Sequence, residues 1–304
     1  MAFAAFGSNN SSKPSKPTKT GKVVIALLAP GLAYLGAFFL TPLIALIMVS
    51  LQIPDPAGGY AEYVPALEIG NYGYVIAEYL PHILRSFAYA LAATVLALLI
   101  SYPLAYFIGV KARPWPMLQK LMLTLVIAPF FISFLLRTLA WKQLFSNESW
   151  IVTTLQDSGL LDQTQYVVGT PFMVIFGLTY NFIPFMTLPL YTSLERLDIR
   201  YLEAGSDLYA SPAKVFRKVT LPLSMPGIIS GTLLTFIPIA GDYVNASGDF
   251  LGSSSTAMIG NVIESNYLQI NDYPSASALS VLLMGVILVL VSVYVRKSGT
   301  EDLL

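Results

Sequence analysis

The sequence predicts an all-α integral membrane protein with six transmembrane helices, and three observations support this prediction. The chain of 304 residues is 55% apolar and only 11% charged, against about 25% charged residues in a typical soluble domain. Its mean hydropathy is +0.67. Its apolar residues gather in six runs, each long enough to cross a hydrocarbon core of about 30 Å. So few charges cannot cover the surface of a soluble domain.

The chain begins with a polar stretch, residues 1–22, which is rich in Ser, Asn, Pro, Thr and Lys. This composition predicts a disordered basic tail on the cytoplasmic side. A signal peptide is the alternative. It is disfavoured because the apolar run that follows continues to about Leu51, too long for the apolar core of a signal peptide. Residues 298–304 are predicted to form a short C-terminal tail, also cytoplasmic.

The predicted membrane domain, residues 23–297, contains the six apolar segments. They are residues 23–51, 86–110, 118–141, 170–194, 222–243 and 277–296. Most of them contain Pro or Gly, for example Pro103, Pro129 and Pro184. Broken membrane helices are tolerated where neighbouring helices or cavities satisfy the freed backbone groups. This pattern is more typical of a transporter than of a passive anchor.

The positions of Lys and Arg predict the orientation. If both termini and the loops 111–120 and 195–221 share one side, that side holds 14 of the 17 Lys and Arg residues. The positive-inside rule places this side in the cytoplasm. The other loops, residues 52–85, 142–169 and 244–276, then face outward, and they are acidic. The sequence therefore predicts a multi-pass protein of the cytoplasmic (inner) membrane.

A polar stretch between the fourth and fifth segments, residues 198–221, predicts two short helices. Asp198 fits the N-cap position of the first helix, and Ser211 followed by Pro212 fits the first two positions of the second. Pro222 marks the start of the next apolar segment. A simple connection between membrane helices needs only a few flexible residues. A helix-turn-helix here therefore predicts a docking surface.

This stretch resembles the cytoplasmic EAA loop of permease subunits in ATP-binding-cassette (ABC) importers. Glu203-Ala204 opens the family pattern and Leu221-Pro222 closes it. Gly205 stands where the family usually has a second Ala, and Tyr209 stands where it usually has the Gly of the turn. Two alternatives follow for the turn. Either Tyr209 adopts an ordinary φ and the turn shifts, or Gly205 takes part of the bend.

Other stretches resemble spermidine/putrescine-type permeases, and the likeness extends over about residues 23–297. They are Leu136–Trp141, which is similar to an Arg-x-x-Ala-Trp signature, Ile183–Asp198, Gly241–Val244 and Met258–Ile263. The resemblance implies a type I ABC importer permease (MetI-like) fold with a cytoplasmic coupling helix. It also implies import of a small solute by alternating access, with a polyamine as the expected substrate. Permeases for ferric ion, thiamine and sulfate are related, and these substrates remain alternatives.

The resemblance also implies partners. Residues 198–221 would couple the chain to an ABC ATPase, through Glu203, Ala204, Gly205, Asp207 and Leu208. The complete importer would contain a second homologous permease, two ATPase subunits and an extracytoplasmic solute-binding protein, embedded in membrane lipid. No cofactor is expected on this chain, because the G-x-x-x-x-G-K-[ST] motif is absent and ATP and Mg would bind the ATPase. The alternative, an interfacial helix lying on lipid, is disfavoured because Glu203 and Asp207 would meet anionic headgroups.

Five residues near the predicted outer ends are candidates for the substrate pathway: Arg137, Asp242, Tyr243, Glu264 and Tyr267. An ionisable residue in a membrane segment is a functional candidate by default. A carboxylate beside an aromatic ring suits an ammonium group. The alternatives are structural pairing or snorkelling for Arg137, and a helix-end carboxylate facing water for Asp242.

Two other function classes are disfavoured. A membrane-embedded enzyme would need clustered nucleophiles or metal ligands, but the chain has no Cys, a single His and no H-E-x-x-H or G-x-S-x-G motif. An ion-coupled secondary transporter would need acidic or His relays inside its helices, and this chain has acidic residues only near helix ends. The equal numbers of acidic and basic residues, 17 each, identify no nucleic-acid partner.

Overall fold

The computed structural model describes residues 20–162 and 164–297, so most of the predicted N-terminal tail and all of the C-terminal tail lie outside the described residues. The chain divides into two compact units, residues 1–48 and 49–304. The first unit holds α1 (Thr20–Leu35), a π-helical turn η1 (Gly36–Leu40) and most of α2 (Thr41–Ser50). Residues Leu27–Ser50 are apolar enough to cross a membrane, with a mean hydropathy of 2.3.

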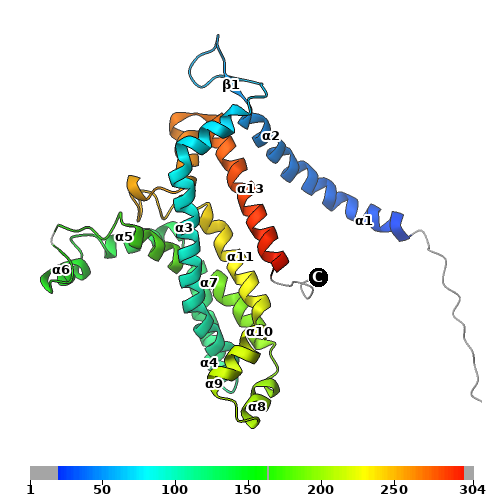
Figure 1. Cartoon of the computed structure of the whole chain (residues 1–304), viewed down its shortest axis with the longest axis vertical. Helices are drawn as coiled ribbons and strands as arrows, with labels where there is room; N and C mark the ends of the chain where they lie inside the picture. Colours follow the sequence, from blue (N-terminus) through cyan, green and yellow to red (C-terminus); the bar gives the residue numbers. More distant parts are fainter. Residues whose placement is uncertain (1–19, 163, 298–304) are drawn as a thin grey trace, which may run out of the picture. The chain divides into compact units, whose positions relative to one another are not determined.

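The second unit contains four long helices. They are α3 (Gly70–Tyr106), which continues through the π-helical turn η2 (Phe107–Lys111), α7 (Pro171–Glu195), α11 (Met225–Ala240) and α13 (Tyr273–Lys297). Helices α3, α7 and α11 pack side by side (Figure 1). A row of fully buried small residues lines the α3 side of this contact: Ala90, Ala93, Ala97, Ser101 and Ala105. Small residues allow membrane helices to approach closely.

Helices α7 and α11 approach each other closely at two glycines of α11. A Cβ atom on Gly227 would lie 2.8 Å from the carbonyl oxygen of Pro189, and one on Gly231 would lie 3.1 Å from that of Met186. The spacing of four residues places both glycines on one face of α11. This G-x-x-x-G pair therefore fixes the distance between the two helices.

Two of the predicted segments, the third and the fifth, are associated with bends. Before the fifth, residues 212–223 meet α11 at an angle of 64°. The third consists of α4 (Pro116–Ile127) with the 3-10 turn η3 (Ala128–Phe131), followed by α5 (Phe134–Leu144) at an angle of 93°. The chain is extended at Ile132, directly after the turn that contains Pro129. The structure holds four helices that are long and apolar enough to span a membrane, or six if each bent pair is one span, within the described residues. The prediction of six spans is compatible with the second count.

The second predicted segment begins earlier than expected. Helix α3 starts at Gly70 rather than near residue 86, so the predicted outer loop 52–85 is partly helical. Its first turns bury Val75 in a cluster with Ile259 and Leu279. Packing against these protein neighbours therefore stabilises the extension. The single His, His82, lies on it instead of in a loop.

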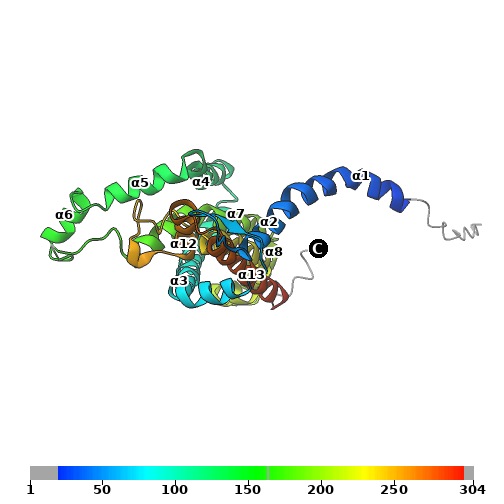
Figure 2. The ribbon, with the colours of Figure 1, turned by 90° about the horizontal axis from the view of Figure 1, so that it is seen from above.

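The remaining elements are short. They are β1 (Ile53–Pro54) paired antiparallel with β2 (Tyr63–Val64), α6 (Trp150–Asp157), α8 (Arg200–Asp207), α9 (Pro212–Val215), η4 (Phe216–Thr220), α10 (Leu221–Leu223), η5 (Ser254–Thr256), α12 (Ile259–Ser265) and η6 (Asn266–Ile270). Helices α8 and α9 lie at one end of the bundle, and the β1–β2 pair lies at the other (Figure 1). Helices α5 and α6 extend sideways from the bundle in both views (Figures 1 and 2).

Candidate functional site

The loop between α7 and α11 forms the two short helices predicted from the sequence. Asp198 Oδ1 accepts a hydrogen bond from the backbone N–H of Arg200 at 3.0 Å, at the start of α8. Ser211 is the N-cap residue of α9 and Pro212 is its first helical residue. Directly after the second helix, Phe216 at the start of η4 packs its ring edge-on against Tyr102, with 5.5 Å between centroids, and so holds this part of the loop to the bundle. The two predicted helices are confirmed, as is the start of the second at Ser211 and Pro212. The predicted N-cap of the first is wrong by one residue, because Ile199 occupies that position and Asp198 lies just before it.

Both predicted alternatives for the turn between these helices are wrong. Tyr209 itself takes the left-handed conformation, with φ +57°, at the position where the family usually has Gly. The end of α8 remains hydrogen-bonded there, because the N–H of Tyr209 donates to the Ser206 carbonyl at 2.9 Å and that of Ala210 donates to the Gly205 carbonyl at 3.2 Å. An L-residue in this conformation costs about 1–2 kcal/mol. The Tyr209 side chain is 99% exposed, so its own packing returns none of that energy.

Gly205 lies where α8 meets α9. A Cβ atom on Gly205 would lie 2.9 Å from Cγ2 of Val215, so Gly205 lets α8 pack closely on α9. Leu202 is half-buried and packs against the core cluster that includes Tyr191 and Leu194. The exposed part of the predicted docking surface is therefore Glu203, Ala204, Asp207 and Leu208, with Tyr209 added at its tip.

Replacing Tyr209 with Gly is expected to raise the free energy of unfolding by about 1 kcal/mol, because Gly adopts a positive φ without the Cβ clash but loses more chain entropy on folding. Tyr209→Ala is the matched control. It removes the ring but keeps Cβ, so it should give no gain. Thermal unfolding of the purified protein measures both variants. Equal stability of the Gly and Ala variants would contradict the left-handed turn.

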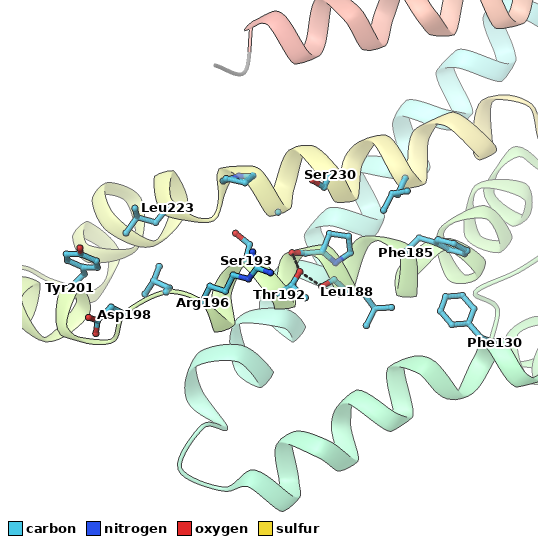
Figure 3. A pocket seen from close by; sticks show the side chains of 15 residues that line it. Phe130, Phe185, Leu188, Thr192, Ser193, Arg196, Asp198, Tyr201, Leu223 and Ser230 are labelled. Carbon is cyan, nitrogen blue, oxygen red and sulfur yellow. Dashed lines mark hydrogen bonds between the residues drawn. The ribbon is translucent and has the colours of Figure 1, made fainter. Parts of the chain in front are cut away.

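A groove of about 860 Å³ leads from this loop into the bundle, between α7 and α11. Figure 3 shows Phe130 and Phe185 at one end of the groove and Asp198, Tyr201 and Leu223 at the other. Its walls are mostly apolar, with the hydroxyl groups of Thr192, Ser193 and Ser230 between the two ends. The Thr192 hydroxyl donates to backbone carbonyls of its own helix. The groove can therefore admit a solute while offering it few charged groups.

A second cavity, of about 410 Å³, shares Phe130 and Phe185 with the groove. These two rings pack edge to face with 5.0 Å between centroids, so an aromatic pair stands between the two spaces. Arg137 and Asn181 line the second cavity, together with Phe134 and Phe182. The cavity exists because α5 turns away from α4 and brings Arg137 over α7.

A chain of buried amide and carboxylate groups lies behind this cavity. The Asn181 side-chain amide donates to Thr138 Oγ1 at 3.2 Å and to Asn245 Oδ1 at 3.1 Å. The Asn245 amide donates in turn to Asp242 Oδ2 at 3.0 Å, and its backbone N–H donates to Oδ1 at 2.8 Å. Asp242 is only 8% exposed. Its carboxylate therefore braces the loop after α11, and the alternative of a carboxylate in outer water does not hold.

The structure does not bring the five predicted pathway residues together. Arg137 alone lines the cavity next to the groove. Tyr243 is exposed, and Glu264 lines a separate cavity of about 440 Å³. Tyr267 packs edge-on against Tyr273 with 5.1 Å between centroids. The sequence reasoning missed Phe130, Phe185 and Asn181. An Asn inside an apolar segment was the one available signal.

Comparisons with known proteins agree with the sequence and with the fold. The profile of the family described as "Binding-protein-dependent transport system inner membrane component" matches residues 125–297. The spermidine/putrescine transport system permease protein PotB of Haemophilus influenzae is 35% identical over 278 residues, covering 91% of this chain and 93% of that protein. PotB of Escherichia coli is 38% identical over 223 residues, covering 72% of this chain and 78% of that protein.

Two solved structures have a similar fold at low sequence identity. A chain of a bacterial ABC transporter involved in the import of the acidic polysaccharide alginate superposes with a TM-score of 0.64 at 18% identity, covering 93% of this chain and 97% of its own length. A chain of the MetNI methionine ABC transporter, in an inward-facing conformation, superposes with a TM-score of 0.56 at 18% identity, covering 73% and 94%. The predicted MetI-like fold class is confirmed.

Proposed function

This chain belongs to the family of binding-protein-dependent transport system inner membrane components, and from this membership we infer that it is the permease subunit of a polyamine ABC importer. It is a multi-pass inner-membrane protein. The observation that carries the substrate class is the 35% identity to a spermidine/putrescine permease over 93% of that permease. The expected substrates are therefore spermidine and putrescine.

We propose that the α8–α9 loop is the surface on which a separate ATPase acts. The exposed side chains of Glu203 and Leu208 and the α8–α9 hairpin support this proposal. The enrichment of Lys and Arg in the 195–221 loop supports its placement in the cytoplasm, together with both termini. ATP and Mg would bind the ATPase subunits, so this chain would hold no cofactor and catalyse no reaction itself.

We propose that the groove is one half of the translocation pathway and that a second, homologous permease supplies the other half. Its position between α7 and α11 and its opening beside Asp198 and Tyr201 support an inward-open state. The faces of Phe130 and Phe185 would contact the ammonium groups of a polyamine through cation–π attraction. An extracytoplasmic binding protein would deliver the substrate to the acidic outer loops.

The test is uptake of labelled spermidine and putrescine by proteoliposomes that contain this chain, its second permease and the ATPase, with the binding protein added outside. We expect uptake that requires ATP and that an excess of unlabelled polyamine suppresses. Thiamine, sulfate and ferric ion serve as competitors, and suppression by one of them alone would assign the substrate to that solute. ATP-independent uptake by this chain alone would contradict the proposal and favour an ion-coupled transporter.

A further inference from the structure

Arg137 is a buried cation that lacks an anionic partner among the described residues. Its side chain is only 9% exposed, and its Nε and Nη1 atoms are buried with no hydrogen-bond partner. The Phe134 ring is the nearest compensating group, with its centroid 6.0 Å from the guanidinium carbon. Arginine does not lose its proton in proteins, so Arg137 cannot avoid the charge. A buried charge left without a partner is strongly destabilising.

The acidic group nearest along the hydrogen-bond chain is already engaged. Both carboxylate oxygens of Asp242 accept hydrogen bonds from Asn245, and Asn181 stands between Asp242 and the cavity. Asn181 is itself incompletely satisfied, because its Oδ1 atom is buried without a partner. The cavity therefore presents free guanidinium donors and a free amide oxygen on adjacent walls.

No acidic side chain among the described residues supplies the missing anion, and the acidic residues of the C-terminal tail, Glu301 and Asp302, are predicted on the cytoplasmic side, opposite to Arg137. A polyamine cannot supply it, because ammonium groups repel a guanidinium. The cavity adjoins the groove through the shared Phe130–Phe185 pair. Under the proposed function, a second permease covers this groove face to close the pathway. A carboxylate is the side-chain group that pairs best with the guanidinium fork, because it accepts two parallel hydrogen bonds.

We propose that Arg137 forms an ion pair with a carboxylate of the second permease subunit, inside the cavity beside Phe130 and Phe185. This proposal rests on the proposed function, since it requires a second permease on the groove face. The pair joins the two subunits at the aromatic end of the groove. The same carboxylate would attract an arriving ammonium group, so Arg137 competes with the substrate for it.

Cross-linking identifies the partner. In Arg137→Lys, a membrane-permeant carbodiimide should join the new amine to the paired carboxylate, and peptide mass spectrometry of the assembled importer shows which chain carries it. We expect a link from position 137 to an Asp or Glu of the second permease. A link to this chain's own Asp242, or no link at position 137, would overturn the proposal. If an anionic lipid were the true partner, no link to a protein carboxylate would form at position 137.

The requirement for positive charge is tested separately, since the chain contains no Cys and Arg137→Cys introduces a single reactive thiol. We expect the variant to lose most ATP-driven uptake. A methanethiosulfonate reagent that adds an ammonium group should restore it, whereas one that adds a sulfonate should not. Equal activity after both reagents would contradict the ion pair.

The matched control is Lys142→Cys on the same helix. Within the described part of the chain, the Lys142 ammonium group donates to two backbone carbonyls, those of Gly248 and Asp249, at 3.2 and 2.8 Å. Uptake by the importer that carries Lys142→Cys should therefore be the same after either reagent. Uptake by the unmodified importer separates the two proposals. If the unmodified importer shows no uptake, the proposed function fails. The cross-link tests the ion pair independently, because it is detected without any transport.

Discussion

Gly227→Val is expected to separate α11 from α7 and to abolish ATP-driven uptake. A Cβ atom at Gly227 would lie 2.6 Å from Ser193 Cβ, 2.8 Å from the Pro189 carbonyl oxygen and 3.2 Å from Leu190 Cα. Two of these three atoms are backbone atoms, which cannot rotate away as the end of a long side chain can. Overpacking of this kind typically costs about 1–3 kcal/mol, and the rigid neighbours here place the expected loss of stability at about 3 kcal/mol.

The chain provides a matched control for this substitution. Gly285 also lies in a membrane helix, α13, and a Cβ atom there would meet nothing within 4 Å. Gly285→Val therefore introduces the same side chain without the clash, and should leave the midpoint of thermal unfolding nearly unchanged. Thermal unfolding of the purified importer and uptake into proteoliposomes measure both variants. Equal stability of the two variants would mean that α7 and α11 are not in close contact at Gly227.

Glu203→Lys is expected to detach the ATPase while leaving the bundle folded. The Glu203 side chain is exposed on α8, so the free energy of unfolding should hardly change. Loss of a charged contact at a docking surface costs about 2 kcal/mol or more, which corresponds to an affinity roughly 30-fold weaker. The ATPase subunits should then fail to co-purify with the permease, and ATP-driven uptake should fall with them.

Glu148→Lys controls for the change of charge, because Glu148 is also exposed but precedes α6, far along the chain from the loop. It should retain the ATPase subunits and transport normally. Normal capture of the ATPase by Glu203→Lys would move the docking surface away from α8. Leu208 and Tyr209 would then be the next positions to examine on the exposed tip.

The sequence was sufficient to predict the fold class and the α8–α9 loop, because both depend on local signals. Hydropathy identified the membrane segments, and Ser211-Pro212 marked the start of α9. The first turns of α3 were missed because polar residues and Pro81 interrupt the apolar run there, whereas packing against α12 and α13 stabilises them. The left-handed Tyr209 was missed because no local preference places an aromatic residue there.

The candidate pathway was predicted less well, and the reason is geometric. Arg137 was singled out as an ionisable residue in an apolar segment. However, its cavity depends on the 93° bend between α4 and α5, which hydropathy cannot reveal. Asp242, Glu264 and Tyr267 were selected for their chemistry alone, and tertiary packing places them in separate surroundings. The aromatic pair of Phe130 and Phe185 appears only when η3 meets α7.

Labelling from each side of the membrane tests whether the α8–α9 loop faces the cytoplasm, where a separate ATPase can act on it. Because the chain has no Cys, Glu203→Cys provides a single target for a membrane-impermeant maleimide. We expect labelling in inside-out vesicles, protection there when the ATPase subunits are added, and no labelling in right-side-out vesicles. Labelling of position 203 in right-side-out vesicles would contradict this placement of the loop.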